Sequence, residues 1–252
     1  MSDSLGSGGG SRGGGFTLST AHWPEVEAGP RRLLVVPVGS LEQHGAHLPL
    51  DTDTRIAAAV AARACAGRPG VGLAPPIAIG ASGEHADFPG TLSIGSVALS
   101  TLLVELGRHA SLHWPATLLV NGHGGNVTAI GDAVGQLRRE GRRSHVWHAG
   151  LRPGALAAGG GLTPDAHAGR VETSMMLALA PDDVRLDAAA AGDTRPLTDI
   201  LSDLSAHGVR QVSPNGVLGD PAGASGDEGE QLLSLLVADL SQTIDGMLTS
   251  MQ

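Results

Sequence analysis

The sequence predicts an α/β fold: a single domain with a mostly parallel sheet flanked by helices. Two observations predict this class. Short apolar runs at 33–38 and 117–120 are continuous rather than alternating, as in strands that are buried on both faces. Longer segments with helical periodicity separate these runs, and strands that alternate with helices form parallel sheets. A chain of 252 residues is long enough for one large domain of this kind.

Each element of the first half has its own signal. The run Leu33–Val38 is apolar at every position, which predicts a strand. Residues 54–66 are rich in alanine and predict a helix, and Asp53 stands where the N-cap of that helix is expected. Residues 97–113 have leucines at helical spacing, and 117–120 form a second buried strand.

The second half continues the alternation. A helix is expected over 127–140, a strand over 144–148 and a strongly apolar helix over 168–180. An amphipathic helix over 230–247 is the last element. The glycine-rich segment 150–164 is expected to be a loop.

The N-terminal segment differs in composition from the rest. Residues 1–15 contain seven glycines and four serines and have little to bury. We therefore expect residues 1–28 to be a disordered Gly/Ser-rich tail and lead-in. No further linker or repeat interrupts the chain, so residues 29–252 are expected to form one domain.

Charge and cysteine content exclude several classes of function. The chain has 16 basic residues, all arginine, against 25 acidic ones, which gives a net charge of −9. Without a basic run, this balance argues against nucleic acid or an anionic membrane as partner. No secretory signal is visible at the N-terminus, and the single cysteine, Cys65, fits a reducing compartment. These features predict a cytoplasmic protein.

Polar residues gather where the two buried strands end. Glu42 and His44 follow the first strand, with Asp53 shortly after them, and His123 follows the second strand among several glycines. In sheets of this class the functional loops leave the carboxyl ends of the strands. Carboxylate oxygens and imidazole nitrogens are the ligands of Zn²⁺, Fe²⁺ or Mn²⁺ in hydrolytic sites. These four residues are therefore candidate metal ligands.

A third polar cluster lies at the start of the apolar helix. His167 and Glu172 are found there, and the residues that follow are apolar on every face of the helix. Such a helix is expected to be buried, and a buried carboxylate is unfavourable unless it is paired or binds a metal. Arg170 is too near on the same turn to be an obvious partner. Glu172 is therefore a fifth candidate ligand.

Each of these residues also has a simpler interpretation. A single His or Glu at a strand end is more often a hydrogen-bonded loop residue than a ligand. Asp53 is also explained as a helix cap, and Glu172 as a member of a buried ion pair. A non-catalytic protein with a structural metal site is a further alternative, but such sites are closed and usually rich in cysteine. The convergence of three clusters at predicted loops favours a metal-dependent enzyme.

At these residues the sequence resembles the creatininase (creatinine amidohydrolase) family. The matching stretches are 37–45 with 48–53, Phe-Pro-Gly-Thr at 88–91, Asn-Gly-His-Gly-Gly-Asn at 121–126, and 167–169 with 172–174. The spacing of the stretches covers the chain from about residue 30 to residue 245. The resemblance implies an α/β fold with a two-metal amide hydrolase site, assembled as a homo-oligomer, usually a hexamer.

The resemblance also implies roles for individual residues. Glu42 and His44 would each bind one ion, Asp53 would bridge the two ions, and His123 would complete the ligands of the first. His167 matches a histidine that protonates the leaving nitrogen. This ligand set suits Zn²⁺, Fe²⁺ and Mn²⁺, so two divalent ions are expected, Zn²⁺ or Fe²⁺ ahead of Mn²⁺.

Two positions depart from the family pattern. Creatininase has a further metal-binding glutamate where this chain has Gly125, and Glu172 is the candidate substitute. Its tyrosine beside the metal-binding histidine is Gly124 here, and the chain contains no tyrosine at all. Because a flat heterocycle is held by stacking on aromatic rings, creatinine is not the expected substrate.

Other stretches point to a group of members within the family. Residues 51–56, 79–94 and 216–221 look like the members that cut a modified precursor peptide and release its C-terminal Val-Tyr-derived dipeptide. The resemblance therefore implies a modified precursor peptide as substrate. The alternative is an amidohydrolase or deformylase of the same fold that acts on a small cyclic amide or a formamide.

Overall fold

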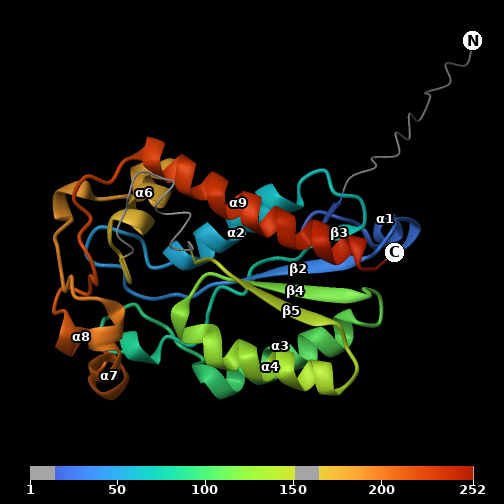
Figure 1. The fold of residues 1–252 in the computed structure, drawn as a ribbon, viewed down its shortest axis with the longest axis horizontal. Helices are drawn as coiled ribbons and strands as arrows, with labels where there is room; N and C mark the ends of the chain where they lie inside the picture. The colour runs from blue at the N-terminus through green and yellow to red at the C-terminus, as the bar shows by residue number, and fades with distance from the viewer. Residues whose placement is uncertain (1–14, 151–164, 252) are drawn as a thin grey trace, which may run out of the picture.

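The sheet at the centre of the molecule has five parallel strands. The structure is a computed structural model that describes residues 15–150 and 165–251 (Figure 1). The strand order is β1-β3-β2-β4-β5, and every pair of neighbours is parallel. The strands are β1 (Phe16–Thr17), β2 (Leu33–Val38), β3 (Val71–Leu73), β4 (Ala116–Asn121) and β5 (Ser144–His148). The predicted fold class is confirmed.

Helices cover both faces of this sheet. The helices are α1 (Trp23–Ala28), α2 (Thr52–Cys65), α3 (Gly95–Ala110), α4 (Val127–Arg139), α6 (Arg170–Leu179), α7 (Leu197–His207), α8 (Val209–Val212) and α9 (Gly226–Thr249). Figure 1 shows α2, α6 and α9 on one side of the sheet and α3 and α4 on the other, with α7 and α8 at one end. Across the described part of the chain, no helix combines the length and apolar character that a bilayer crossing requires.

The two central strands explain why the sheet is covered on both sides. Every residue of β2 and β4 is buried. Alternate residues of a strand point to opposite faces. Leu33 and Val35 therefore belong to the core under α2, α6 and α9, whereas Leu34 and Val36 belong to the core under α3 and α4. A continuous apolar run is the sequence that this double burial requires.

Two short strands were not predicted from the sequence. β1 has two residues and β3 has three, and the middle residue of β3 is Gly72, so neither strand has a periodic signal. β1 and α1 lie within the predicted lead-in, and β1 pairs with β3. The division of the chain into 1–28 and 29–252 stays a prediction. Most of the loop expected over 150–164 lies outside the described residues.

The start of α2 differs from the prediction. The helix begins at Thr52 and its N-cap position is Asp51, so the prediction of Asp53 as N-cap was wrong. Asp53 lies instead in the first turn, where its Oδ2 accepts a 2.7 Å hydrogen bond from the hydroxyl of Ser40. The side chain is therefore directed at the loop after β2 rather than at its own helix.

The backbone after β2 packs closely on the first turn of α2. A Cβ atom at Gly39 would lie 2.5 Å from Cα of Thr54 and 2.7 Å from its amide nitrogen. We expect Gly39→Ala to lower the free energy of unfolding by about 1–3 kcal/mol because the two segments must separate. Equilibrium urea denaturation measures this change.

Gly131→Ala is the matched control. Gly131 is exposed on α4, and a Cβ there meets nothing within 4 Å. Alanine is the better helix former, so this variant should gain about 0.5–1 kcal/mol. An unchanged stability in Gly39→Ala would contradict the close approach of the two segments.

Candidate metal centre

The five predicted metal ligands lie together at the carboxyl ends of β2 and β4. Glu42, Asp53 and His123 form one group, in which the ligand atoms are within 4.8 Å of one another. His44, His167 and Glu172 form a second group under the same limit. Glu42, His44, Asp53 and His123 are buried, and Glu172 is half-buried. The two groups constitute a candidate binuclear site.

Asp53 lies between the two groups. Its Oδ1 is 3.0 Å from Nε2 of His44, and its Oδ2 is 3.1 Å from Nδ1 of His123. Each carboxylate oxygen therefore faces a histidine from a different strand-end loop. From this position one carboxylate can reach both groups, as the family resemblance implied for a bridging ligand.

Backbone carbonyls orient the two ligand histidines. The Nδ1–H of His44 donates to the carbonyl oxygen of Glu42 at 3.1 Å, which leaves Nε2 facing Asp53. The Nε2–H of His123 donates to the carbonyl oxygen of Ala81 at 3.1 Å, which leaves Nδ1 facing Asp53. Metal-binding histidines are held in this way, with one nitrogen tied to an acceptor and the other free for the ion.

The carboxylate of Glu42 has no hydrogen-bond partner among the described residues. The side chain is 0% exposed, and both oxygens are buried. Its Oε2 is 3.1 Å from Nε2 of His123, and its Oε1 is 3.4 Å from Nε2 of His85. Burial of a carboxylate without compensation costs several kcal/mol. A divalent cation beside Glu42 would supply the missing charge, so the residues present fit a metal centre.

The carboxylates of the cluster favour positive charge on the neighbouring groups. Burial alone would lower the pKa of His44, but Asp53, Glu172 and Glu42 outweigh it and raise that pKa to about 10. Burial likewise opposes a charged His123, yet the nearby carboxylates raise its pKa well above the usual value. In the chain without metal, protons on the two rings compensate the carboxylates. Divalent ions would replace these protons.

His167 lies at the edge of the cluster. Its Nε2–H donates to the carbonyl oxygen of Gln43 at 2.8 Å, and its Nδ1 is 3.8 Å from Oε1 of Glu42. Burial, with repulsion from His44, lowers the pKa of His167 well below its usual value. The ring is therefore neutral at pH 7, with a lone pair on Nδ1. His167 lies beside the predicted metal ligands, and its catalytic role stays a prediction.

Sequence reasoning missed two residues of the site, Glu84 and His85. They lie in a short 3₁₀ helix, η1 (Gly83–His85), in the segment after β3. Burial lowers the pKa of His85 to about 4. The sequence did contain a signal for these two residues: a carboxylate next to a histidine, shortly before the Phe-Pro-Gly-Thr motif. Because β3 was not recognised, nothing placed this loop at the same edge of the sheet.

Glu84 occupies the space beside Gly125. A Cβ atom at residue 125 would collide with Oε1 of Glu84 and with the carbonyl oxygen of Ala81. The same Glu84 oxygen is 3.4 Å from Nε2 of His123. The carboxylate expected to replace the family glutamate, Glu172, lies on the other side, with Oε2 3.9 Å from Nε2 of His44. Gly125 provides no metal-binding carboxylate, but Glu84 and Glu172 each place one beside the cluster.

A cavity of about 930 Å³ opens beside the cluster. Glu42, His123 and His167 line it on one side. Leu197 and Leu201 of α7 line another side and are exposed. Among the described residues that line it, none is an arginine, a phenylalanine or a tryptophan. The cavity is therefore lined by carboxylates and imidazoles near the cluster and by leucines along part of α7.

The fold and the ligand cluster have counterparts in known proteins. Residues 19–244 match the family described as Creatininase: Creatinine amidohydrolase. This chain belongs to the creatininase family. A mycofactocin precursor peptide peptidase of Mycolicibacterium smegmatis is 50% identical over 211 residues, 81% of each chain. A creatinine amidohydrolase of Pseudomonas putida is 31% identical over 248 residues, 88% of this chain and 93% of the other.

Solved creatininase structures have the same fold. The structure described as Creatininase Mn superposes with a TM-score of 0.74 at 27% sequence identity. The match covers 93% of this chain and 99% of that one. The predicted creatininase-like fold is thus confirmed over nearly the whole chain.

Metal binding by this creatininase-family chain should release protons. With a pKa of about 10, His44 is charged at pH 7 without metal, and an ion binds only the neutral ring. Apparent Zn²⁺ affinity should therefore rise with pH between 6 and 8, by about tenfold per unit for each proton released. Isothermal titration calorimetry in buffers of different ionisation enthalpy counts these protons. Zn²⁺ binding without proton release would contradict this electrostatic description.

Proposed function

We propose that this chain is a metal-dependent peptidase that cleaves the modified mycofactocin precursor peptide and releases its C-terminal Val-Tyr-derived dipeptide. The observation behind the proposal is the position of two groups of metal-ligating side chains beside a cavity of about 930 Å³. The 50% identity to a peptidase of this function, against 31% to a creatinine amidohydrolase, supports the peptide substrate. By family resemblance, the active form is a homo-oligomer, a hexamer.

In this proposal the ligands divide between two ions. Glu42, Asp53 and His123 would hold the first, and His44, Asp53 and Glu172 would hold the second. The expected ions are Zn²⁺ or Fe²⁺, or else Mn²⁺. One related structure is described as Creatininase Mn. When bound, two such ions lower the pKa of a nearby water and polarise the scissile carbonyl.

His167 moves the proton. Its neutral ring has a lone pair on Nδ1, which takes one proton from the attacking water while the water oxygen bonds to the carbonyl carbon. The same proton then passes from Nδ1 to the amide nitrogen as the C–N bond breaks. The products are a carboxylic acid and a free amine, and the ring returns to its neutral form.

The shape of the cavity favours a peptide over a small heterocycle. A volume of about 930 Å³ lies near the upper end for small-molecule pockets. The exposed leucines of α7 offer an apolar surface for a substrate side chain. The described lining residues offer no phenylalanine or tryptophan on which a flat ring would stack.

Removal of a ligand should abolish both metal binding and cleavage. His44→Ala and Asp53→Ala should lose bound metal, measured by inductively coupled plasma mass spectrometry, and at least about 100-fold in kcat/KM. Cleavage is measured by mass spectrometry of the products from the modified precursor peptide, with each metal added in turn. His145→Ala, on β5 and outside the site, is the control and should keep both properties.

Two results would overturn parts of this proposal. Full activity in a demonstrably metal-free protein would exclude the metal-dependent mechanism. Hydrolysis of small cyclic amides or formamides without cleavage of the peptide would favour the alternative amidohydrolase or deformylase. Loss of metal in both variants together with loss of peptide cleavage supports the proposal.

A further inference from the structure

The helix α7 presents two leucines to the cavity. Its large apolar residues follow helical spacing and form one stripe, which consists of Leu197, Ile200, Leu201 and Leu204. Ile200 and Leu204 are buried in a small core, whereas Leu197 and Leu201 are 47% and 54% exposed. Both exposed leucines line the cavity. One half of the stripe therefore holds α7 in place, and the other half faces the space beside the candidate ligands.

A hydrogen-bonded segment connects this helix to His167. The amide of Leu218 donates to the carbonyl oxygen of His167 at 2.9 Å, and the amide of His167 donates to the carbonyl oxygen of Leu218 at 3.1 Å. The side-chain amide of Gln43 donates to the carbonyl oxygen of Gly216 at 3.0 Å, which ties the same segment to the loop after β2. Leu218 lies in the same small core as the buried half of the α7 stripe. The exposed half of the stripe is therefore on the His167 side of the cluster.

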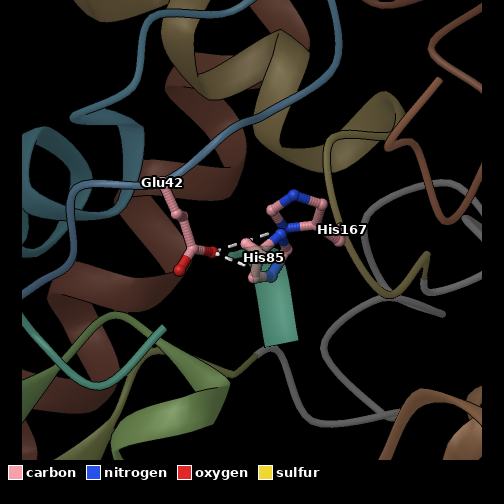
Figure 2. A group of neighbouring side chains, drawn as sticks. All are labelled: Glu42, His85 and His167. Atoms are coloured by element: carbon pink, nitrogen blue, oxygen red, sulfur yellow. Dashed lines mark ion pairs between the residues drawn. The ribbon is translucent and has the colours of Figure 1, made fainter. Parts of the chain in front are cut away.

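The proposed function places the leaving amine on this side as well. Figure 2 shows the rings of His85 and His167 next to each other and directed at the carboxylate of Glu42, and the ring centroids are 4.6 Å apart. In the proposed function, His167 delivers the proton to the amide nitrogen, so the amine product lies beside this ring as the C–N bond breaks. The amine half of the substrate is therefore the part that reaches α7.

The acyl half of the substrate has a different wall. Gly124 and Gly125 follow the candidate ligand His123 and line the cavity together with Val127, which is 48% exposed. The two glycines have no side chains, so this wall offers room for a substrate backbone. An apolar side chain on the acyl side would contact Val127, whereas one on the amine side would contact α7. Variants of the two walls distinguish these positions.

The charges beside α7 restrict the side chain that it accepts. Glu84 and Asp87 line the cavity, and its described lining residues include no arginine. The backbone of Glu84 lies close to the end of α7, because a Cβ atom at Gly208 would be 3.1 Å from the carbonyl oxygen of Glu84. A substrate carboxylate beside the leucines would have no arginine partner, and its desolvation would be unfavourable. An uncharged apolar side chain fits this environment.

We propose that Leu197 and Leu201 form the subsite for the side chain of the residue that supplies the leaving amine. This inference rests on the proposed function and names its substrate class, peptides with an uncharged aliphatic residue directly after the scissile bond. The valine of the proposed Val-Tyr-derived product is such a residue. Contact between its methyl groups and the two leucines removes apolar surface of both partners from water. The two leucines thus determine specificity and take no part in proton transfer.

Binding of synthetic dipeptide amides tests the subsite without turnover. Val-Tyr amide represents the product, and isothermal titration calorimetry measures its Kd for the Zn²⁺-loaded protein. Leu201→Ala should weaken binding about fivefold, and the double variant with Leu197→Ala about 20-fold, because apolar contacts are lost. Ala-Tyr amide lacks two methyl groups, so it should bind about tenfold more weakly to the wild type and lose less than about twofold in Leu201→Ala.

Two variants outside the proposed subsite are the controls. Leu186 is 52% exposed and is not among the described residues that line the cavity, so Leu186→Ala should leave the Kd of Val-Tyr amide unchanged. Val127→Ala shortens the apolar side chain of the other wall and should also leave this Kd unchanged. An unchanged Kd in Leu201→Ala, or a loss of binding in Val127→Ala alone, would overturn the proposal.

A charged variant should reverse the preference. The wild type should bind Asp-Tyr amide at least about tenfold more weakly than Val-Tyr amide, because the carboxylate finds no arginine beside α7. In Leu201→Arg the introduced guanidinium pairs with this carboxylate, so Asp-Tyr amide should bind more tightly than Val-Tyr amide. A variant that keeps the wild-type order of the two amides would contradict contact between residue 201 and the side chain.

Kinetics on the modified precursor peptide separate this inference from the proposed function. In Leu201→Ala, kcat/KM should fall about fivefold while the content of bound Zn²⁺ stays at the wild-type value. Cleavage with an unchanged kcat/KM would overturn the subsite and leave the peptidase function standing. Binding of the dipeptide amides in the expected order, in a wild-type protein that does not cleave the peptide, would support the subsite and overturn the proposed function.

Discussion

The buried carboxylate of Glu42 is the constraint on which the rest of the site depends. It has 0% exposure and accepts no hydrogen bond from the described residues. An ionised carboxylate in this position is stable only beside positive charge. The neighbouring rings of His44 and His123 are tied to backbone carbonyls through one nitrogen each, so the other nitrogen faces the carboxylates. In the proposed function, two divalent ions would supply this charge in place of protons on the rings.

The sheet supplies the geometry that brings these groups together. β2 and β4 pair in parallel, with Val38 opposite Asn121, so the loops that follow them leave the sheet side by side. Both strands are buried on both faces, which places them at the centre of the sheet. The close packing of Gly39 on the first turn of α2 then directs Asp53 at both loops. Asp53 and Glu172 thus lie on helices, whereas Glu42, His44 and His123 lie in loops that begin at the ends of β2 and β4.

The sequence predicts those site residues that follow a strand with a clear apolar pattern. β2 has the predicted bounds, and its apolar run placed Glu42 and His44 at the correct edge of the sheet. The strand before His85 has three residues with a glycine at its centre, too short for a pattern, so this histidine was missed. The contact between Gln43 and Gly216 joins segments far apart in the chain, and no local pattern reveals such a hydrogen bond.

Anomalous diffraction at the zinc edge, from crystals of the Zn²⁺-loaded protein, tests the central claim most directly. Two zinc peaks are expected, one among Glu42, Asp53 and His123, and one beside His44 and Glu172. A single peak, or no zinc beside these residues, would contradict the claim that two ions compensate the buried carboxylates.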